Sequence, residues 1–270
     1  MKKRIKVTMF LVVNIFLFSN LLYSQKNKFE LVNSFHTNFA NQGVAVDQNN
    51  IYVINTREIA KYDKHSFKKL SVWKNNNGAI KHLDSGVTLK GKLYCAHSNF
   101  PELPMTSSIE IWDTETLEHV GNHSFGIKYG SCTWIDFKDE YWYVAFANYK
   151  IFEQKNGKDA HWTLIVKFDQ DWNEKEAWVF PEEIIKRFGS MSNSGGSFGP
   201  DGLLYCTGHD NPEIYKLKFP KYGSELNLIE IIEINNTGQG IAWDRTVGNE
   251  NIIYCIDKKS KKINVIKYIR

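Results

Sequence analysis

A tyrosine recurs near the start of five short apolar runs, and this repeat constrains the fold more than any other feature of the chain. The five tyrosines lie 42, 49, 62 and 49 residues apart, and they are Tyr52, Tyr94, Tyr143, Tyr205 and Tyr254. A period of roughly 40–50 residues that is built from strands is typical of propeller blades. The repeat therefore predicts an all-β, five-bladed β-propeller in which each tyrosine marks the second strand of a blade.

Further apolar segments flank each tyrosine run and would complete four-stranded blades. The segments before the tyrosines begin with small or amide residues, as inner strands crowded around one axis require, and they cover 42–47, 85–89, 131–136, 195–198 and 239–244. Alternating third strands follow at 59–63, 109–113, 164–169, 214–218 and 263–267. Outer strands are expected at 69–74, 119–125, 175–180 and 226–234.

The last repeat lacks an outer strand, because the chain stops at Arg270 straight after a third strand. Residues 28–35 have a strand pattern and no blade of their own. We expect this mature N-terminal strand to pair with the last blade and close the ring, which would remove a free sheet edge.

The first 24 residues have the pattern of a secretory signal peptide: a basic start, an apolar run from Val7 to Phe18 and a short polar end. This predicts an exported protein, periplasmic or secreted, with one propeller domain over 25–270 and no membrane span once the signal is removed. The net charge of +4 equals the four basic residues of the signal. The mature chain is then close to neutral, which argues against nucleic acid as a partner. We expect a monomer.

Three of the four cysteines, Cys95, Cys206 and Cys255, occupy the same place after the repeat tyrosine. Equivalent sites in separate blades are too far apart for a disulfide, which needs Cα atoms within about 7 Å. We expect buried free thiols, and a bridge from Cys132 to a neighbour is the alternative.

Polar side chains gather at one mouth of the predicted channel, where loops that enter inner strands meet loops that leave second strands. We expect this mouth to bind a small molecule. The residues expected to bind the substrate are Gln42, Asn55, Arg57, Asp84, Asn99, Asn148, Asn193, Gln239 and Asp257.

Two histidines end second strands in the same way, and we expect His97, His209 and Asp210 to be the catalytic groups. A histidine with a pKa near 6.5 serves as acid or base when a carboxylate orients it. A structural histidine bonded to a loop carbonyl is the alternative. His97, His209, Asp84 and Asp210 could also bind a divalent cation as a mixed nitrogen and oxygen site, although no compact ligand spacing supports a metal.

Two segments, 39–44 and 204–215, resemble the plant-type glutaminyl cyclases, which are five-bladed propellers of about this length. That resemblance implies cyclase chemistry, although Val53 stands where the family has a catalytic glutamate. The blade starts are also similar to those of calcium-dependent propeller lactonases, with Gln42, Ser85 and Gln239 at the positions of the metal ligands.

Together these features predict lactonase, cycloisomerase or cyclase chemistry that uses acid and base groups at the channel mouth. A propeller that binds a protein or glycan on the same face without catalysis is the alternative hypothesis.

Overall fold

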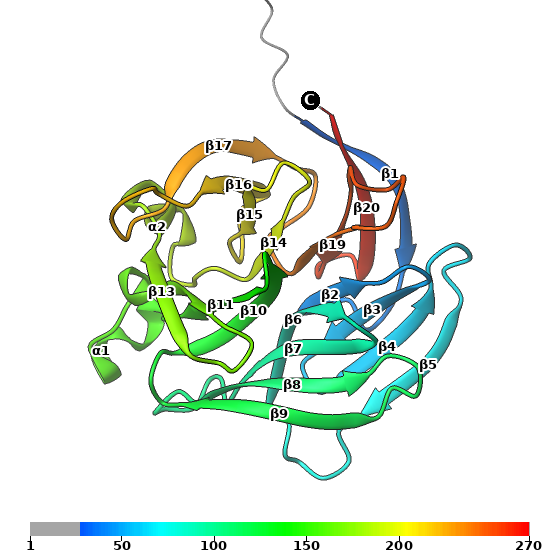
Figure 1. Cartoon of the computed structure of the whole chain (residues 1–270), viewed down its shortest axis with the longest axis horizontal. Coiled ribbons are helices and arrows are strands. Elements are labelled where there is room, and N and C mark those ends of the chain that lie inside the picture. Colours follow the sequence, from blue (N-terminus) through cyan, green and yellow to red (C-terminus); the bar gives the residue numbers. More distant parts are fainter. Residues whose placement is uncertain (1–27, 270) are drawn as a thin grey trace, which may run out of the picture.

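A computed structural model describes residues 28–269, and in it five four-stranded antiparallel sheets are arranged as the blades of a propeller. Figure 1 looks along the central axis, with the inner strands at the centre and the outer strands at the rim. The five-bladed, all-β prediction is confirmed. The predicted signal peptide lies outside the described residues. No described helix is long and apolar enough to span a membrane.

The first four blades each use four consecutive strands, ordered from the axis outward. Blade 1 is β2 (Gly43–Val46), β3 (Asn50–Asn55), β4 (Glu58–Asp63) and β5 (Lys69–Lys74). Blade 2 is β6 (His82–Leu89), β7 (Lys92–Ser98), β8 (Ser107–Asp113) and β9 (His119–Gly126). Blade 3 is β10 (Ser131–Lys138), β11 (Tyr141–Ala147), β12 (Leu164–Phe168) and β13 (Glu174–Val179). Blade 4 is β14 (Gly195–Phe198), β15 (Leu204–Thr207), β16 (Glu213–Lys218) and β17 (Asn227–Glu233).

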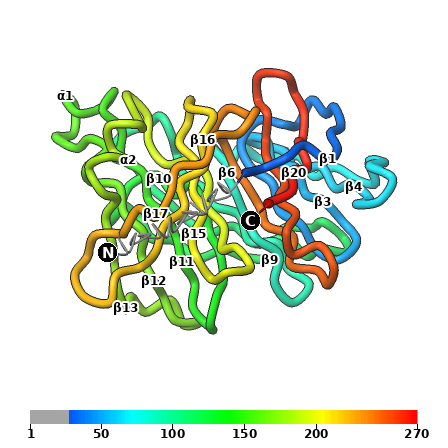
Figure 2. The backbone as a smooth tube through the Cα atoms, turned by 90° about the horizontal axis from the view of Figure 1, so that it is seen from above, coloured from blue at the N-terminus to red at the C-terminus, as the bar shows by residue number. Residues whose placement is uncertain are grey.

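The fifth blade joins the two ends of the described chain. It consists of β18 (Ile241–Trp243), β19 (Ile252–Asp257), β20 (Lys262–Ile269) and β1 (Lys28–His36). β1 runs antiparallel to β20, with Lys28 opposite Ile269 and His36 opposite Lys262. Both views show these two strands side by side (Figures 1 and 2). The N-terminal strand is therefore the outer strand of the last blade.

Short helices lie in the third repeat, which is the longest. η1 (Lys150–Phe152), α1 (Glu153–Asn156) and η2 (Ala160–Trp162) lie between β11 and β12. α2 (Glu182–Phe188) follows β13 and has two glutamates in its first turn and two basic residues in its last. These charges complement the helix dipole. α2 buries Ile184, Ile185 and Phe188 in the core between blades 3 and 4.

Apolar clusters between neighbouring blades form the core. Four of the repeat tyrosines are buried, and Tyr94 is half-buried. The Tyr52 hydroxyl donates to Asp47 at 2.7 Å and the Tyr205 hydroxyl donates to Asp201 at 2.9 Å. The tyrosines are thus packing residues, and the hydroxyl groups of Tyr52 and Tyr205 also stabilise the turn before their own strand.

The inner strands approach one another so closely that glycine is required at some positions. A Cβ atom on Gly43 would lie 2.4 Å from the Cα of Ser85, and one on Gly240 would lie 2.6 Å from the Cα of Gly43. No real Cβ contact is this short, so blades 1, 2 and 5 meet backbone to backbone at the axis.

Candidate functional site

The two ends of the channel have different chemistry. Inner strands begin, and second strands finish, at one end, because Gly43 pairs with Ile54. We call this the His82 end, and it contains the residues predicted to form the site. Inner strands finish at the opposite end, which we call the Arg245 end.

A buried carboxyl group is the most unusual feature of the His82 end. Asp84 is 6% exposed, and its Oδ1 atom has no hydrogen-bond partner. Its Oδ2 atom lies 4.0 Å from Nε2 of His82. Burial raises the pKa of Asp84 well above its usual value, against the opposing effects of the Ser85 backbone N–H and the charge of Lys258. Asp84 therefore holds a proton at a pH where ordinary aspartates are ionised.

The imidazole beside Asp84 is shifted in the opposite direction. Burial lowers the pKa of His82 to about 4, and the positive charges of Lys258 and Arg57 act in the same sense. Burial also lowers the pKa of Lys258, although the carboxylates of Asp84 and Asp210 favour its charged form. Within the pair, the proton is therefore on the carboxyl group rather than on the imidazole.

His97 is held at both ring nitrogens. Its Nε2 accepts the backbone N–H of Lys81 at 3.0 Å, so Nδ1 carries the hydrogen and donates to Ser108 Oγ at 2.8 Å. Ser108 in turn donates to Glu110 Oε1 at 2.6 Å. Burial lowers the pKa of His97. The ring is thus a neutral link in a hydrogen-bond chain, with neither nitrogen free for a substrate.

The other two predicted catalytic residues lie at the surface. His209 Nδ1 is 2.6 Å from Asp210 Oδ1, and the Asp210 side chain is 67% exposed. No hydrogen bond or ion pair between described residues joins His209 to His97. Asp210 and Asp84 both favour the charged form of Lys258.

Four of the predicted amides stabilise the loops that contain them. Asn99 donates to Pro104 O and accepts from Thr106 N–H. Asn148 donates to the carbonyls of Tyr129 and Trp162, and Asn193 donates to those of Gly195 and Thr207. Asn55 accepts from Asn41 Nδ2 at 2.9 Å. These hydrogen bonds hold the loops at the mouth of the channel.

The remaining predicted residues also lie at the His82 end. Gln42 Nε2 is 3.5 Å from Thr56 Oγ1, and Arg57 Nε donates to Lys81 O at 3.3 Å. Gln239 is buried, and its backbone carbonyl accepts the Thr207 hydroxyl. Asp257 accepts two hydrogen bonds from Ser260 in the following turn. Asp84 is the one residue of the predicted set with a buried side-chain oxygen that lacks a partner among the described residues.

The Arg245 end contains a cavity of about 150 Å³ that the inner strands of all five blades line. A second cavity of about 390 Å³ adjoins it and shares Trp243 and Arg245. The Arg245 guanidinium pairs with the buried carboxylate of Asp136, which also accepts the Phe198 N–H at 2.8 Å. None of the residues predicted to form the site lies at this end. Two aspartates, Asp136 and Asp244, end predicted inner strands in the sequence, and this pattern could have indicated a polar site here.

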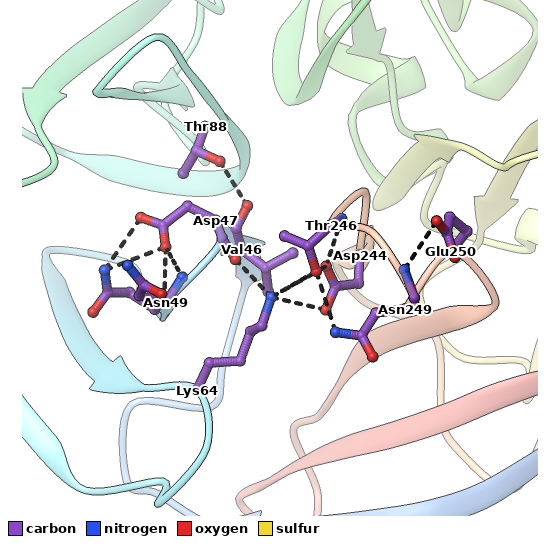
Figure 3. A network of polar contacts seen from close by, with 11 residues as sticks. Val46, Asp47, Asn49, Lys64, Thr88, Asp244, Thr246, Asn249 and Glu250 are labelled. Atoms are coloured by element: carbon purple, nitrogen blue, oxygen red, sulfur yellow. Dashed lines mark hydrogen bonds and ion pairs between the residues drawn. The ribbon is translucent and has the colours of Figure 1, made fainter.

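A buried ion pair supports the wall of this end (Figure 3). Lys64 Nζ lies 3.0 Å from Asp244 Oδ2, and the two side chains are 3% and 1% exposed. Lys64 also donates to Asp47 O at 2.8 Å and to Thr246 Oγ1 at 3.2 Å. The pair connects the third-strand turn of blade 1 to the inner strand of blade 5.

Among residues 28–269, no group of three or more histidine, cysteine, aspartate and glutamate side chains is placed to hold a metal ion. All four cysteines are buried and free, as expected.

Comparisons with known proteins support the fold. No family model matches the chain, and no curated protein sequence matches it either. The PQQ-bound aldose sugar dehydrogenase of Streptomyces coelicolor has a similar structure, with a TM-score of 0.52 and 12% identity over 85% of this chain and 78% of that one. A chain of the mitotic checkpoint complex has a TM-score of 0.51 and 8% identity over 99% of each chain. The neighbours thus include an enzyme and a component of a protein assembly, and at these identities the likeness is one of fold: the chain is a β-propeller.

Proposed function

We propose that the His82 end is a small-molecule site that catalyses ring opening or closure of a lactone or a related cyclic substrate by acid–base chemistry. The observation that carries this proposal is the buried pair of Asp84 and His82, in which Asp84 Oδ1 has no hydrogen-bond partner and Oδ2 lies 4.0 Å from His82 Nε2. Burial shifts the pKa values of the two groups in opposite directions. A neutral carboxyl group next to a neutral imidazole provides a proton donor and a proton acceptor at the same pH, as acid–base catalysis requires.

In lactone hydrolysis, neutral His82 removes a proton from water while the water oxygen attacks the carbonyl carbon. Asp84 gives its proton to the ring oxygen as the ester C–O bond breaks, so that one lactone and one water yield one hydroxy acid. A proton then returns from His82 to Asp84. Ring closure uses the same two groups in reverse. Lys258 and Arg57 supply positive charge for the oxygen that becomes negative at the carbonyl.

The test is turnover of a panel of γ- and δ-lactones by the purified mature chain, followed by pH-stat titration. We expect Asp84→Asn and His82→Gln each to lower kcat by about 10²-fold or more, the usual contribution of a positioned acid or base. Asp257→Asn and His209→Gln are matched controls at the same mouth and should keep activity within about threefold, since neither group is buried beside the reacting pair. Equal activity of Asp84→Asn and wild type would refute the mechanism.

The pH profile gives an independent readout. Activity should fall as the pH drops toward about 4, where His82 becomes protonated, and should also fall at high pH as Asp84 ionises. Saturable lactone binding without turnover would instead favour a binding propeller.

We also propose export, on the basis of the basic and apolar N-terminal 24 residues. Fractionation of cells that express the chain with and without residues 1–24 tests it, and retention of both forms in the cytoplasm would contradict it.

A further inference from the structure

A carboxylate stands at a core position between blades 1 and 2. The strand register allows equivalent positions of the five blades to be compared. In each blade, the residue after the repeat tyrosine pairs with one residue of the third strand. In the five blades that partner is Ala60, Glu110, Val166, Tyr215 and Asn264. Glu110 is therefore the one carboxylate among these five equivalent residues.

Glu110 is 4% exposed. It lies on the same face of β8 as Ser108 and Trp112, and Trp112 packs in the apolar cluster between blades 1 and 2. A carboxyl group that is buried in such a place costs stability unless it is fully hydrogen-bonded. Here Ser108 donates to Oε1 at 2.6 Å and His119 Nε2 donates to Oε2 at 2.7 Å. The Glu110 carboxylate is thus a buried charged group between two blades, and Ser108 and His119 fix its orientation.

A cavity of about 400 Å³ opens beside Glu110, outside the channel. Glu110, His119 and Asn122 come to it from blade 2, and the half-buried indole of Trp73 comes from blade 1. The loop after β5 adds Asn75 and Asn76.

The carboxamide of Asn75 indicates what is bound. Its Nδ2 donates to Ile80 O at 2.7 Å, which fixes the amide, and its Oδ1 is buried with no hydrogen-bond partner. A buried acceptor without a donor costs about 1–3 kcal/mol, and a ligand hydroxyl would satisfy it.

We propose that this inter-blade cavity binds a neutral saccharide of one or two rings. Carboxamides both donate and accept hydrogen bonds, as sugar hydroxyls do, and the tryptophan provides the apolar surface on which a sugar ring packs. An anionic ligand fits poorly, because Glu110 is acidic and Lys74 of this cavity pairs with Glu58 at 3.0 Å.

The test is binding of glucose, galactose, mannose, N-acetylglucosamine, maltose and cellobiose to the purified mature chain, measured by saturation-transfer NMR and titration calorimetry. We expect saturable binding of at least one sugar. Asn122→Ala and Glu110→Gln should each weaken it by about tenfold or more, the effect of losing one hydrogen bond to a ligand hydroxyl.

Asn227→Ala is the matched control, because Asn227 is an exposed asparagine on the outer strand of blade 4. It should leave the sugar affinity unchanged. Asn122 is also exposed on an outer strand, so its variant should fold even if Glu110→Gln does not. The proposal is overturned if none of the six sugars saturates, or if Asn122→Ala binds the sugar as tightly as wild type. The lactone assay of the His82 end is independent of either result.

Discussion

Replacing Lys64 by methionine should destabilise the protein strongly, although this residue is far from the proposed catalytic pair. Lys64 is 5% exposed and contributes four polar contacts: both carboxylate oxygens of Asp244, the Asp47 carbonyl and the Thr246 hydroxyl. The substitution Lys64→Met keeps most of the apolar stem and removes the charge. Asp244 would then be a buried carboxylate without its cation (Figure 3).

Breaking a buried pair from one side costs about 3–5 kcal/mol. Asp244 Oδ1 would still accept the Thr246 N–H at 3.0 Å and its hydroxyl at 2.6 Å. We therefore expect the lower part of that range, about 3 kcal/mol. For a domain of this size each kcal/mol lowers Tm by about 2–4 °C, so the expected loss is about 6–12 °C.

Urea and thermal unfolding followed by circular dichroism measure this loss. Two controls separate charge burial from general damage. Lys175→Met removes an exposed partner of Asp169 and should cost less than about 1 kcal/mol. The double variant Lys64→Met/Asp244→Leu removes both charges and should be more stable than Lys64→Met alone. A loss below about 1 kcal/mol for Lys64→Met, or no recovery in the double variant, would refute the reasoning.

Three further predictions concern pH, packing and the thiols. Because the pKa of Asp84 is raised in the folded state, its contribution to stability is complete below about pH 4 and is lost as the pH rises through the folded pKa. In Asp84→Asn, the urea midpoint of unfolding should therefore depend less on pH above about pH 4. The lowered pKa of His82 gives stability that is lost as pH falls from 6.5 toward about 4, and His82→Gln should remove that loss. Gly240→Ala should cost about 1–3 kcal/mol through overlap with Gly43, whereas Gly121→Ala, whose Cβ meets nothing within 4 Å, should cost far less on thermal unfolding. A thiol reagent should label no cysteine in the native protein and four after unfolding, because all four are buried; rapid native labelling would contradict this.

The blade plan could be predicted from the sequence because it rests on local patterns. Alternation of apolar and polar residues places the outer strand of blade 1 at 69–74, and the structure has β5 at Lys69–Lys74. The N-terminal strand was expected over 28–35 and is observed at Lys28–His36. Side chains alternate between the two faces of a strand. The distance of a residue from the repeat tyrosine therefore predicts which face of the blade its side chain lies on.

The site depended on tertiary contacts, which sequence spacing does not encode. From the sequence His97 was expected to act as an acid or base, yet the backbone N–H of Lys81 and the hydroxyl of Ser108 on the adjacent strand occupy both its nitrogens. Asp84 was one of several polar residues at the mouth, and a buried carboxyl oxygen without a hydrogen-bond partner separates it from the others.

The sequence by itself thus determined the number of blades and their strands, because these follow from the repeat and from side-chain alternation. Tertiary structure decided which polar groups are buried and which remain without partners. Desolvation and hydrogen bonding depend on all the atoms around a group, and in this propeller the core clusters combine residues of neighbouring blades.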